Sequence, residues 1–252
     1  FRNVIVGVTS PYGAYIDKMV RLAEPGNLLF LAPGGIRMAG AAGFVQVDQL
    51  ALSTATTLGF GTRRFGVFDT TAAQAKLLSA APQVGSAGLE VDAVARRAAG
   101  ISGVPGIEAD GISITVDREL LFDAMDGPTR LQDSSLKVQP WQGHGGHLSL
   151  LGQQVSLEGA SSVQATGPWA GGTIQLGGSW QNSNPAVRQA IRTAFGREAW
   201  ADASATLRGN GGTVVVWSDI RNPLAQTSVA GRITARGAGS DGAGGRVETS
   251  GG

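Results

Sequence analysis

The chain has 252 residues, among them 39 glycines and no cysteine, and its formal net charge is +1. Charged residues make up 15% and hydrophobic residues 42% of it, which argues against disorder because disordered chains combine low hydrophobicity with high charge. The small net charge excludes the basic field of a nucleic-acid partner, and the absence of cysteine excludes disulfides, thiolate metal sites and a cysteine nucleophile. No apolar run reaches the roughly 18 residues of a membrane helix, no signal peptide is recognised, and we expect both ends to be cuts within a longer chain.

Strands and tight turns are predicted for residues 1–70. An apolar strand over 29–31 leads into a turn, and an alternating strand over 42–47 precedes a Ser-Thr-Ala element at 53–55. The turn consists of Ala32, Pro33, Gly34, Gly35 and Ile36.

This series resembles the amino-terminal secretion domain of the filamentous haemagglutinin family, the large exoproteins of two-partner secretion. The family pattern is an apolar strand, then Asn-Pro-Asn-Gly-Ile, a corner of small residues, an alternating strand and a Ser-Thr-Ala element. Pro33, Gly35 and Ile36 match this pattern, whereas Ala32 and Gly34 replace the two asparagines. Further matches to the family lie at 10–17, 77–82, 211–219 and 244–251.

The two replacements change what the turn can do. Asparagine side chains bond neighbouring backbone groups, and Ala32 and Gly34 cannot. We therefore expect Pro33 to supply stiffness and a glycine to take the position with positive φ. If the turn is a structural corner only, replacing Ala32 and Gly34 by Asn should alter stability by about 1 kcal/mol or less.

The stretch 71–140 is less regular. Residues 72–80 and 89–99 are expected to form short helices, and the alternation over 112–116 predicts a strand. Residues 121–130 fit neither pattern clearly. We interpret this stretch as extra elements that elaborate the fold of the remainder.

The carboxy-terminal region, 141–252, repeats a Gly-Gly doublet followed by a short alternating strand. The doublets lie at 145–146, 171–172, 211–212 and 244–245, with spacings of 26, 40 and 33 residues. A repeat of this length indicates a solenoid, and its period of two indicates strands. We expect an all-β, right-handed parallel β-helix (solenoid) with extra-helical short strands and one or two short helices. An antiparallel sandwich or barrel is the alternative fold.

One interruption of the repeat is predicted to be a helix. In residues 184–195 Asn184 would be the N-cap and Pro185 the first helical residue, and apolar residues recur at helical spacing. In the strand that follows, alternation should direct Val214 and Val216 into the interior and Val215 outward or under this helix.

Few residues suggest chemistry. His144 and His147, the two histidines, flank a Gly-Gly pair that favours a turn over a metal site. The segment 239–245 has the composition of a calcium turn, but it occurs in a single copy. The pairs Asp117 with Glu119 and Asp123 with Asp126 are the closest carboxylates that would suit a glycosidase or lyase, but neither pair recurs with Lys or Arg on a parallel-strand face. The tryptophans are interpreted as covers for the ends of the core: Trp141, Trp169, Trp180, Trp200 and Trp217.

We therefore expect no catalytic residue, no cofactor and no bound metal. The resemblance implies that the chain is the amino-terminal part of a large adhesin-like exoprotein, secreted or at the cell surface of a Gram-negative bacterium. Region 1–70 would be captured by an Omp85-type outer-membrane transporter and would then template folding outside the cell. A host or neighbouring-cell surface is a further candidate partner. A filament or surface-layer subunit and a β-helix polysaccharide-processing enzyme remain alternatives.

Overall fold

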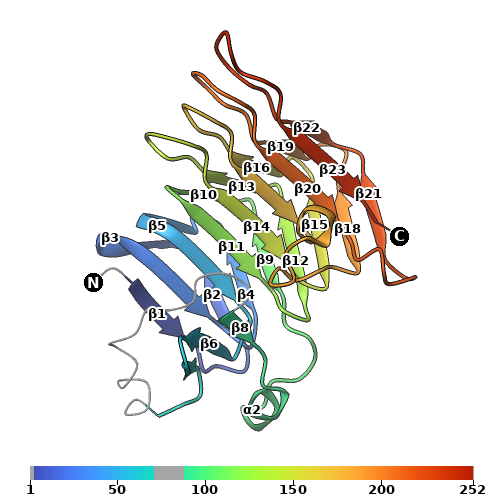
Figure 1. The fold of residues 1–252 in the computed structure, drawn as a ribbon. Coiled ribbons are helices and arrows are strands. Elements are labelled where there is room, and N and C mark those ends of the chain that lie inside the picture. The colour runs from blue at the N-terminus through green and yellow to red at the C-terminus, as the bar shows by residue number, and fades with distance from the viewer. Residues whose placement is uncertain (1–2, 71–87, 252) are drawn as a thin grey trace.

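The computed structural model describes residues 3–70 and 88–251. The chain winds into a parallel β-helix, and successive coils lie side by side from the blue amino-terminal end to the red carboxy-terminal end (Figure 1). The predicted all-β, parallel β-helical fold is therefore confirmed. Within the described residues, antiparallel pairing is limited to a small separate sheet and one isolated bridge between Gly209 and Ala238, so the sandwich and barrel alternatives are wrong.

Among the described residues, three parallel sheets run along the solenoid. The first has the order β1 (Asn3–Gly7), β3 (Met19–Leu31), β5 (Gly43–Ser53), β11 (Glu119–Asp123), β14 (His147–Leu151), β17 (Thr173–Leu176), β20 (Thr213–Trp217) and β23 (Arg246–Ser250). The second has the order β2 (Ala14–Ile16), β4 (Ile36–Ala39), β9 (Ile107–Asp110), β12 (Pro128–Gln132), β15 (Gln154–Glu158), β18 (Arg192–Phe195) and β21 (Gln226–Val229). The third has the order β10 (Ser113–Val116), β13 (Ser135–Val138), β16 (Ser162–Ala165), β19 (Trp200–Asp202) and β22 (Arg232–Thr234).

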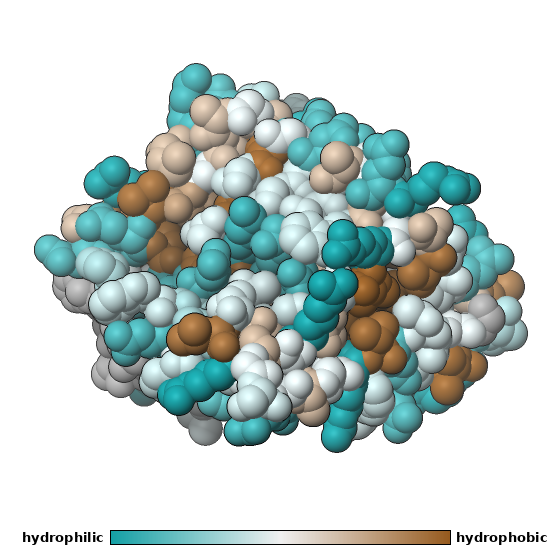
Figure 2. Space-filling view, turned by 90° about the horizontal axis from the view of Figure 1, so that it is seen from above, coloured by the Kyte–Doolittle hydropathy of each residue, from teal (hydrophilic) through white to brown (hydrophobic). Residues whose placement is uncertain are grey.

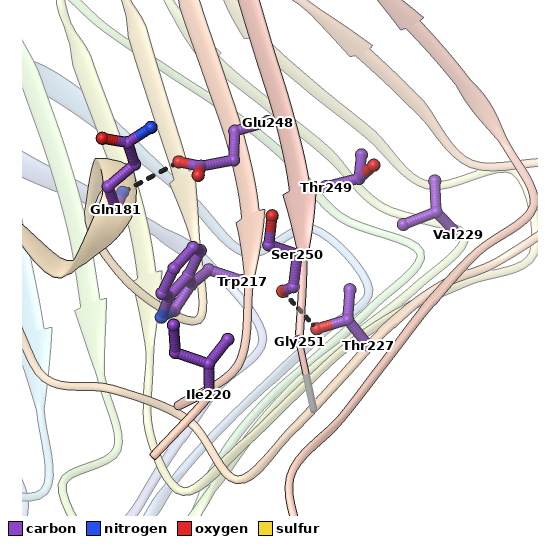
Figure 3. Close-up of a pocket in the computed structure, with 9 residues that line it drawn as sticks. All are labelled: Gln181, Trp217, Ile220, Thr227, Val229, Glu248, Thr249, Ser250 and Gly251. Atoms are coloured by element: carbon purple, nitrogen blue, oxygen red, sulfur yellow. Dashed lines mark hydrogen bonds between the residues drawn. The ribbon is translucent and has the colours of Figure 1, made fainter.

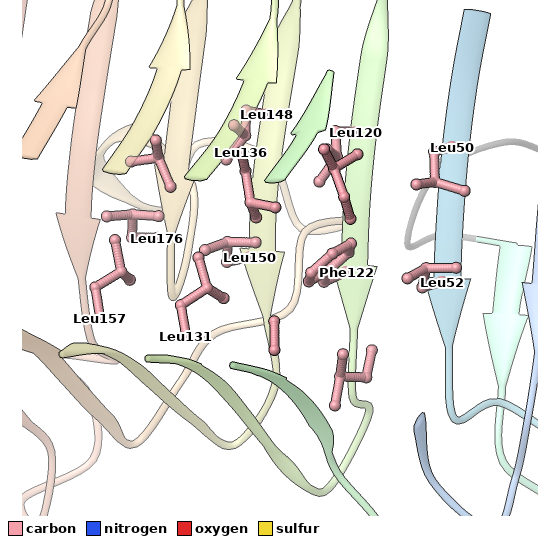
Figure 4. Packing of buried hydrophobic residues seen from close by; sticks show 14 of the residues in the cluster. Leu50, Leu52, Leu120, Phe122, Leu131, Leu136, Leu148, Leu150, Leu157 and Leu176 are labelled. Atoms are coloured by element: carbon pink, nitrogen blue, oxygen red, sulfur yellow. The ribbon is translucent and has the colours of Figure 1, made fainter. Parts of the chain in front are cut away.

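The interior is filled by apolar side chains stacked in register. Leu50, Leu120 and Leu148 are Cα partners in successive strands, and each is at most 1% exposed. They belong to one cluster that receives side chains from all three sheets (Figure 4). Val214 and Val216 lie in this cluster as predicted, while Val215 lies on the opposite face of β20 and is also buried.

The Gly-Gly doublets stack on one another where the chain enters the first sheet. A Cβ atom on Gly172, Gly212 or Gly245 would meet the backbone of the doublet one coil earlier. The repeat seen in the sequence is thus a steric requirement, because neighbouring coils are separated only by the strand spacing of about 4.8 Å.

The outer face of the first sheet carries a second apolar cluster. Leu121 and Leu151 pack there with Leu58 and Phe65, which come from the antiparallel sheet. That sheet has the order β7 (Arg63–Gly66), β6 (Thr57–Phe60), β8 (Leu89–Glu90). Val187, from the connection between β17 and β18, packs against the same cluster. The extra-helical elements predicted from the sequence therefore cover this face.

The prediction of a helix over 184–195 is wrong. Asn184 does accept a bond from the Ala186 N–H at 3.0 Å, but only a turn follows it. Residues 192–195 instead form β18, in which Thr193 pairs with Val155 of the preceding coil. A helix there would break the ladder of the second sheet, and the parallel pairing outweighs the local capping signal.

The other local predictions have mixed outcomes. The helix expected over 89–99 is shorter, α2 (Ala93–Ala98), with Asp92 as its N-cap, and the strand expected over 112–116 is β10. The ambiguous stretch 121–130 comprises the end of β11, a connection over 124–127 and the start of β12, and a short 3-10 helix, η2, covers Trp180–Asn182. The helix expected over 72–80 lies outside the described residues. The division at 70 and 140 stays a prediction.

Exposed apolar residues do not merge into one dominant surface in the view from above, where brown groups are separated by hydrophilic side chains (Figure 2). No helix in the described part of the chain has the length and apolar character needed to cross a membrane.

Candidate functional site

The turn that matches the family motif joins β3 of the first sheet to β4 of the second. The Gly35 N–H donates to the Ala32 carbonyl at 2.9 Å and closes a β-turn with Pro33 at its second position. Gly35 has φ of +108°, so the expected glycine with positive φ is confirmed.

This turn stacks between the corners of the coils on either side. The Ala14 N–H donates to the Gly35 carbonyl at 2.9 Å, and the Ile36 N–H donates to the Gly106 carbonyl at 2.9 Å. The preceding corner is a second β-turn, closed by a 3.1 Å bond from the Gly13 N–H to the Ser10 carbonyl. The motif-like segment is therefore a rigid part of a column of corners.

The stacking leaves no room for the family's asparagines. A Cβ on Gly34 would approach the carbonyl oxygens of Pro11 and Ser10 to 2.7 Å each, and Ala32 is completely buried. An Asn at 34 would have to displace the neighbouring turn, and one at 32 would bury an amide, which costs about 1–3 kcal/mol when unpaired. We therefore now expect both replacements together to cost more than about 1 kcal/mol.

The Ser-Thr-Ala element ties the third coil to the fourth. The buried Ser53 Oγ donates to the Asp123 carbonyl at 2.8 Å, and the buried Thr54 Oγ1 donates to the Ala124 carbonyl at 2.7 Å. These hydroxyls satisfy carbonyls at a corner where the regular ladder ends. Sequence reasoning had given this element no structural role.

A groove of about 870 Å³ begins at the turn and runs along the outer side of β2, β4 and β9. Tyr12 and Tyr15 border it and are 93% and 64% exposed. Arg37 lies on its surface and pairs with Glu108 at 3.1 Å. The turn thus opens onto a surface with two accessible aromatic rings and a solvated ion pair. Both tyrosines lie in the family match at 10–17, but sequence reasoning assigned neither of them a role.

A second groove, of about 730 Å³, lies at the carboxy-terminal coils and is lined by Trp217, Ile220 and Thr227 (Figure 3). Its rim is held by bonds from the Gln181 N–H to Glu248 at 2.9 Å and from Thr227 Oγ1 to the Ser250 carbonyl at 2.8 Å.

Three of the carboxylates considered for catalysis lie beside different arginines. Asp123 is fully buried and pairs with Arg188 at 3.0 Å, whereas Asp126 pairs with Arg96 at 2.9 Å. Burial raises the pKa of the Glu119 carboxyl, and the charges of His147 and Arg118 partly oppose this effect. The Asp117 carboxylate oxygen Oδ2 lies 4.0 Å from Nε of Arg118.

The histidines have different surroundings. His147 lies in β14, and its Nε2 is 3.1 Å from the side-chain oxygen of Gln175, while His144 forms a β-bridge with Ala170. Within residues 3–70 and 88–251, no group of three or more His, Cys, Asp or Glu residues could hold a metal ion. The segment 239–245 lies in the connection between β22 and β23, with a turn at 240–241.

The tryptophans do not share one role. Trp217 is 2% exposed and covers the first sheet, but Trp141 is 85% and Trp169 43% exposed. The interpretation of all of them as core covers is therefore wrong for Trp141, which projects into solvent.

Comparison with known proteins finds a likeness of fold. No family model and no curated protein matches the chain. Among solved structures, the crystal structure of the HMW1 secretion domain from Haemophilus influenzae is similar, with a TM-score of 0.53 and 19% sequence identity. The match covers 92% of this chain and 59% of that one, so the chain spans about three fifths of its structural neighbour. At this identity, the likeness establishes a shared fold.

Proposed function

We propose that the chain is the amino-terminal part of a large, adhesin-like exoprotein exported by two-partner secretion. The observation that carries the proposal is the likeness to the HMW1 secretion domain over 92% of the chain. The position of the motif-like turn, at a corner of this β-helical fold, also supports it. In this proposal the protein is secreted by, or held at the surface of, a Gram-negative bacterium.

The partner in this proposal is an Omp85-type outer-membrane transporter that captures region 1–70 in the periplasm. The groove beside the turn, with Tyr12 and Tyr15 exposed, supports a contact there. Outside the cell the first coils then template the rest, since each strand of the first two sheets from β3 onward, and each strand of the third sheet from β13 onward, bonds to one already placed. Irreversible addition of coils gives export a direction without ATP. A host or neighbouring-cell surface is the proposed target of the exported protein.

The role proposed is structural, without catalysis, cofactor or nucleic-acid partner. The separate ion pairs of Asp123 and Asp126 weigh against the polysaccharide-processing alternative. The filament or surface-layer alternative keeps one specific argument, which is that Ala32 and Gly34 replace the asparagines of the secretion motif.

Export of the Phe30→Asp chain tests the proposal. Phe30 is in β3 just before the turn and packs against the inner core, so an aspartate there should abolish recovery of the protein outside cells that carry the transporter. Phe30→Leu keeps the apolar contact and should be exported normally. Undiminished export of Phe30→Asp would show that region 1–70 is not the secretion signal and would favour the alternative of a filament or surface-layer subunit.

The exposed tyrosines of the groove beside the turn provide a second test of the proposal. The double change Tyr12→Ser and Tyr15→Ser should leave the urea midpoint unchanged but reduce export. Val104→Ser, at a side chain that is 57% exposed, serves as the control. Equal export of the two variants would show that the transporter does not use this groove.

A further inference from the structure

Long loops carry the chain from the third sheet back to the first, and they project side by side from the solenoid (Figure 1). The first two cover 139–146 and 166–172. They are joined by backbone bonds, from the Trp169 N–H to the Gly143 carbonyl at 3.0 Å and from the Gly145 N–H to the Ala170 carbonyl at 2.8 Å. The loops therefore form a continuous surface held in the register of the coils.

A groove of about 260 Å³ lies between these loops. Pro140 and Thr166 in it are buried, whereas Trp141 at its border is 85% exposed. Gln139 and Thr206 add an amide and a hydroxyl to the lining. Thr206 Oγ1 also donates to the Gly167 carbonyl at 3.3 Å, which ties the next loop to the groove.

The residues that line this groove limit the kinds of ligand that it can bind. None of the lining residues is charged, so the groove offers no countercharge to an anionic or cationic ligand. Its two prolines, Pro140 and Pro168, have no N–H to donate to an added peptide strand. The nearby Arg208 guanidinium lies 5.1 Å from the Trp169 ring centroid, which engages that charge outside the groove.

We propose that this groove binds a neutral oligosaccharide. The exposed Trp141 indole provides a flat apolar platform for the C–H face of a sugar ring. The Gln139 amide can donate to and accept from sugar hydroxyls, whereas the Thr206 hydroxyl, whose proton bonds the Gly167 carbonyl, can accept from one. A saccharide combines an apolar face with uncharged polar groups, as the groove does. The site is independent of the secretion motif, which lies on the corner between the first and second sheets.

Binding of the 252-residue chain to an array of neutral glycans that includes maltohexaose, cellohexaose and chitohexaose tests this proposal. We expect binding of at least one neutral glycan, confirmed by calorimetry, and a loss of affinity of roughly tenfold or more in Trp141→Ala. Gln139→Ala should give a smaller loss. Leu207→Ala, at a side chain 67% exposed on the third loop and outside the groove, should bind like the parent.

The contrasting probes are hexagalacturonate and phosphatidylcholine vesicles. Neither should bind, and Trp141→Ala should unfold at the same urea concentration as the parent because the indole is exposed. Failure of every neutral glycan to bind, equal affinity of Trp141→Ala, or preference for hexagalacturonate or vesicles would each overturn the proposal.

Discussion

The two faces of the first sheet carry cores of different origin. The inner core is a stack in which each side chain meets its counterparts one coil before and after, as Leu120 does with Leu50 and Leu148. The outer core instead joins Leu121 to residues inserted elsewhere in the chain, such as Leu58 and Val187. The inner core therefore follows from a repeat, whereas the outer core depends on contacts between distant segments.

The largest effect should come from a charge in the inner core. Val214→Asp places an unpaired carboxylate at a fully buried position and should cost about 4 kcal/mol or more, measured by urea unfolding. Val247 is the Cα partner of Val214 in β23 but is 48% exposed, so Val247→Asp should cost less than about 1 kcal/mol. A Val214→Asp protein as stable as the parent would contradict the stacked interior.

A smaller effect is expected where the 177–191 connection is held to the outer face. Arg188→Met leaves the fully buried Asp123 carboxylate without its ion pair and should cost about 3 kcal/mol. Arg221→Met breaks a solvated pair with Asp219 and should change stability by about 0.5 kcal/mol or less. If both variants unfold at the same urea concentration, Arg188 does not anchor the outer core.

The corner turn gives a test of coil stacking that involves neither core directly. Gly34→Ala must push the Ser10 and Pro11 carbonyls away and should cost about 1–3 kcal/mol in urea unfolding. Gly244 has no atom within 4 Å of an added Cβ, so Gly244→Ala should be close to neutral. Equal stabilities of the two variants would show that the corners do not stack closely.

The smallest effect concerns Glu119, beside the outer core. Burial raises its pKa in the folded chain, so its contribution to stability is present below its ordinary pKa of 4.5 and is lost as the pH rises through the folded-state pKa. Glu119→Gln remains neutral and should be slightly more stable than the parent at pH 7, with the difference vanishing at low pH. Urea midpoints of the parent and of Glu119→Gln at pH 7 and at low pH measure this difference. A parent that is more stable than Glu119→Gln at pH 7 would contradict the prediction.

Sequence reasoning succeeded where structure follows a local repeat. The Gly-Gly doublets and the alternation around Val214 predicted the β-helix and the inward faces, because strand period and coil stacking appear directly in residue order. It failed over 184–195, where an N-cap and helical spacing were real local signals but β18 gains more from pairing with β15 and β21.

The candidate site was predictable only in part. The motif marked the turn and its glycine with positive φ, but nothing in the sequence showed that Gly34 lies against the preceding corner. Exposure of Tyr12, Tyr15 and Trp141 was equally hidden, since an aromatic residue beside a turn reads the same whether it covers a core or faces solvent.

The central claim is transporter-dependent export of this chain. The direct measurement is the amount of the chain outside cells that make it with a secretory leader, compared between cells that carry the two-partner transporter and cells from which it is deleted. We expect the chain to reach the medium or the cell surface only when the transporter is present and to remain in the periplasm otherwise. Equal amounts outside both kinds of cell would contradict the proposal.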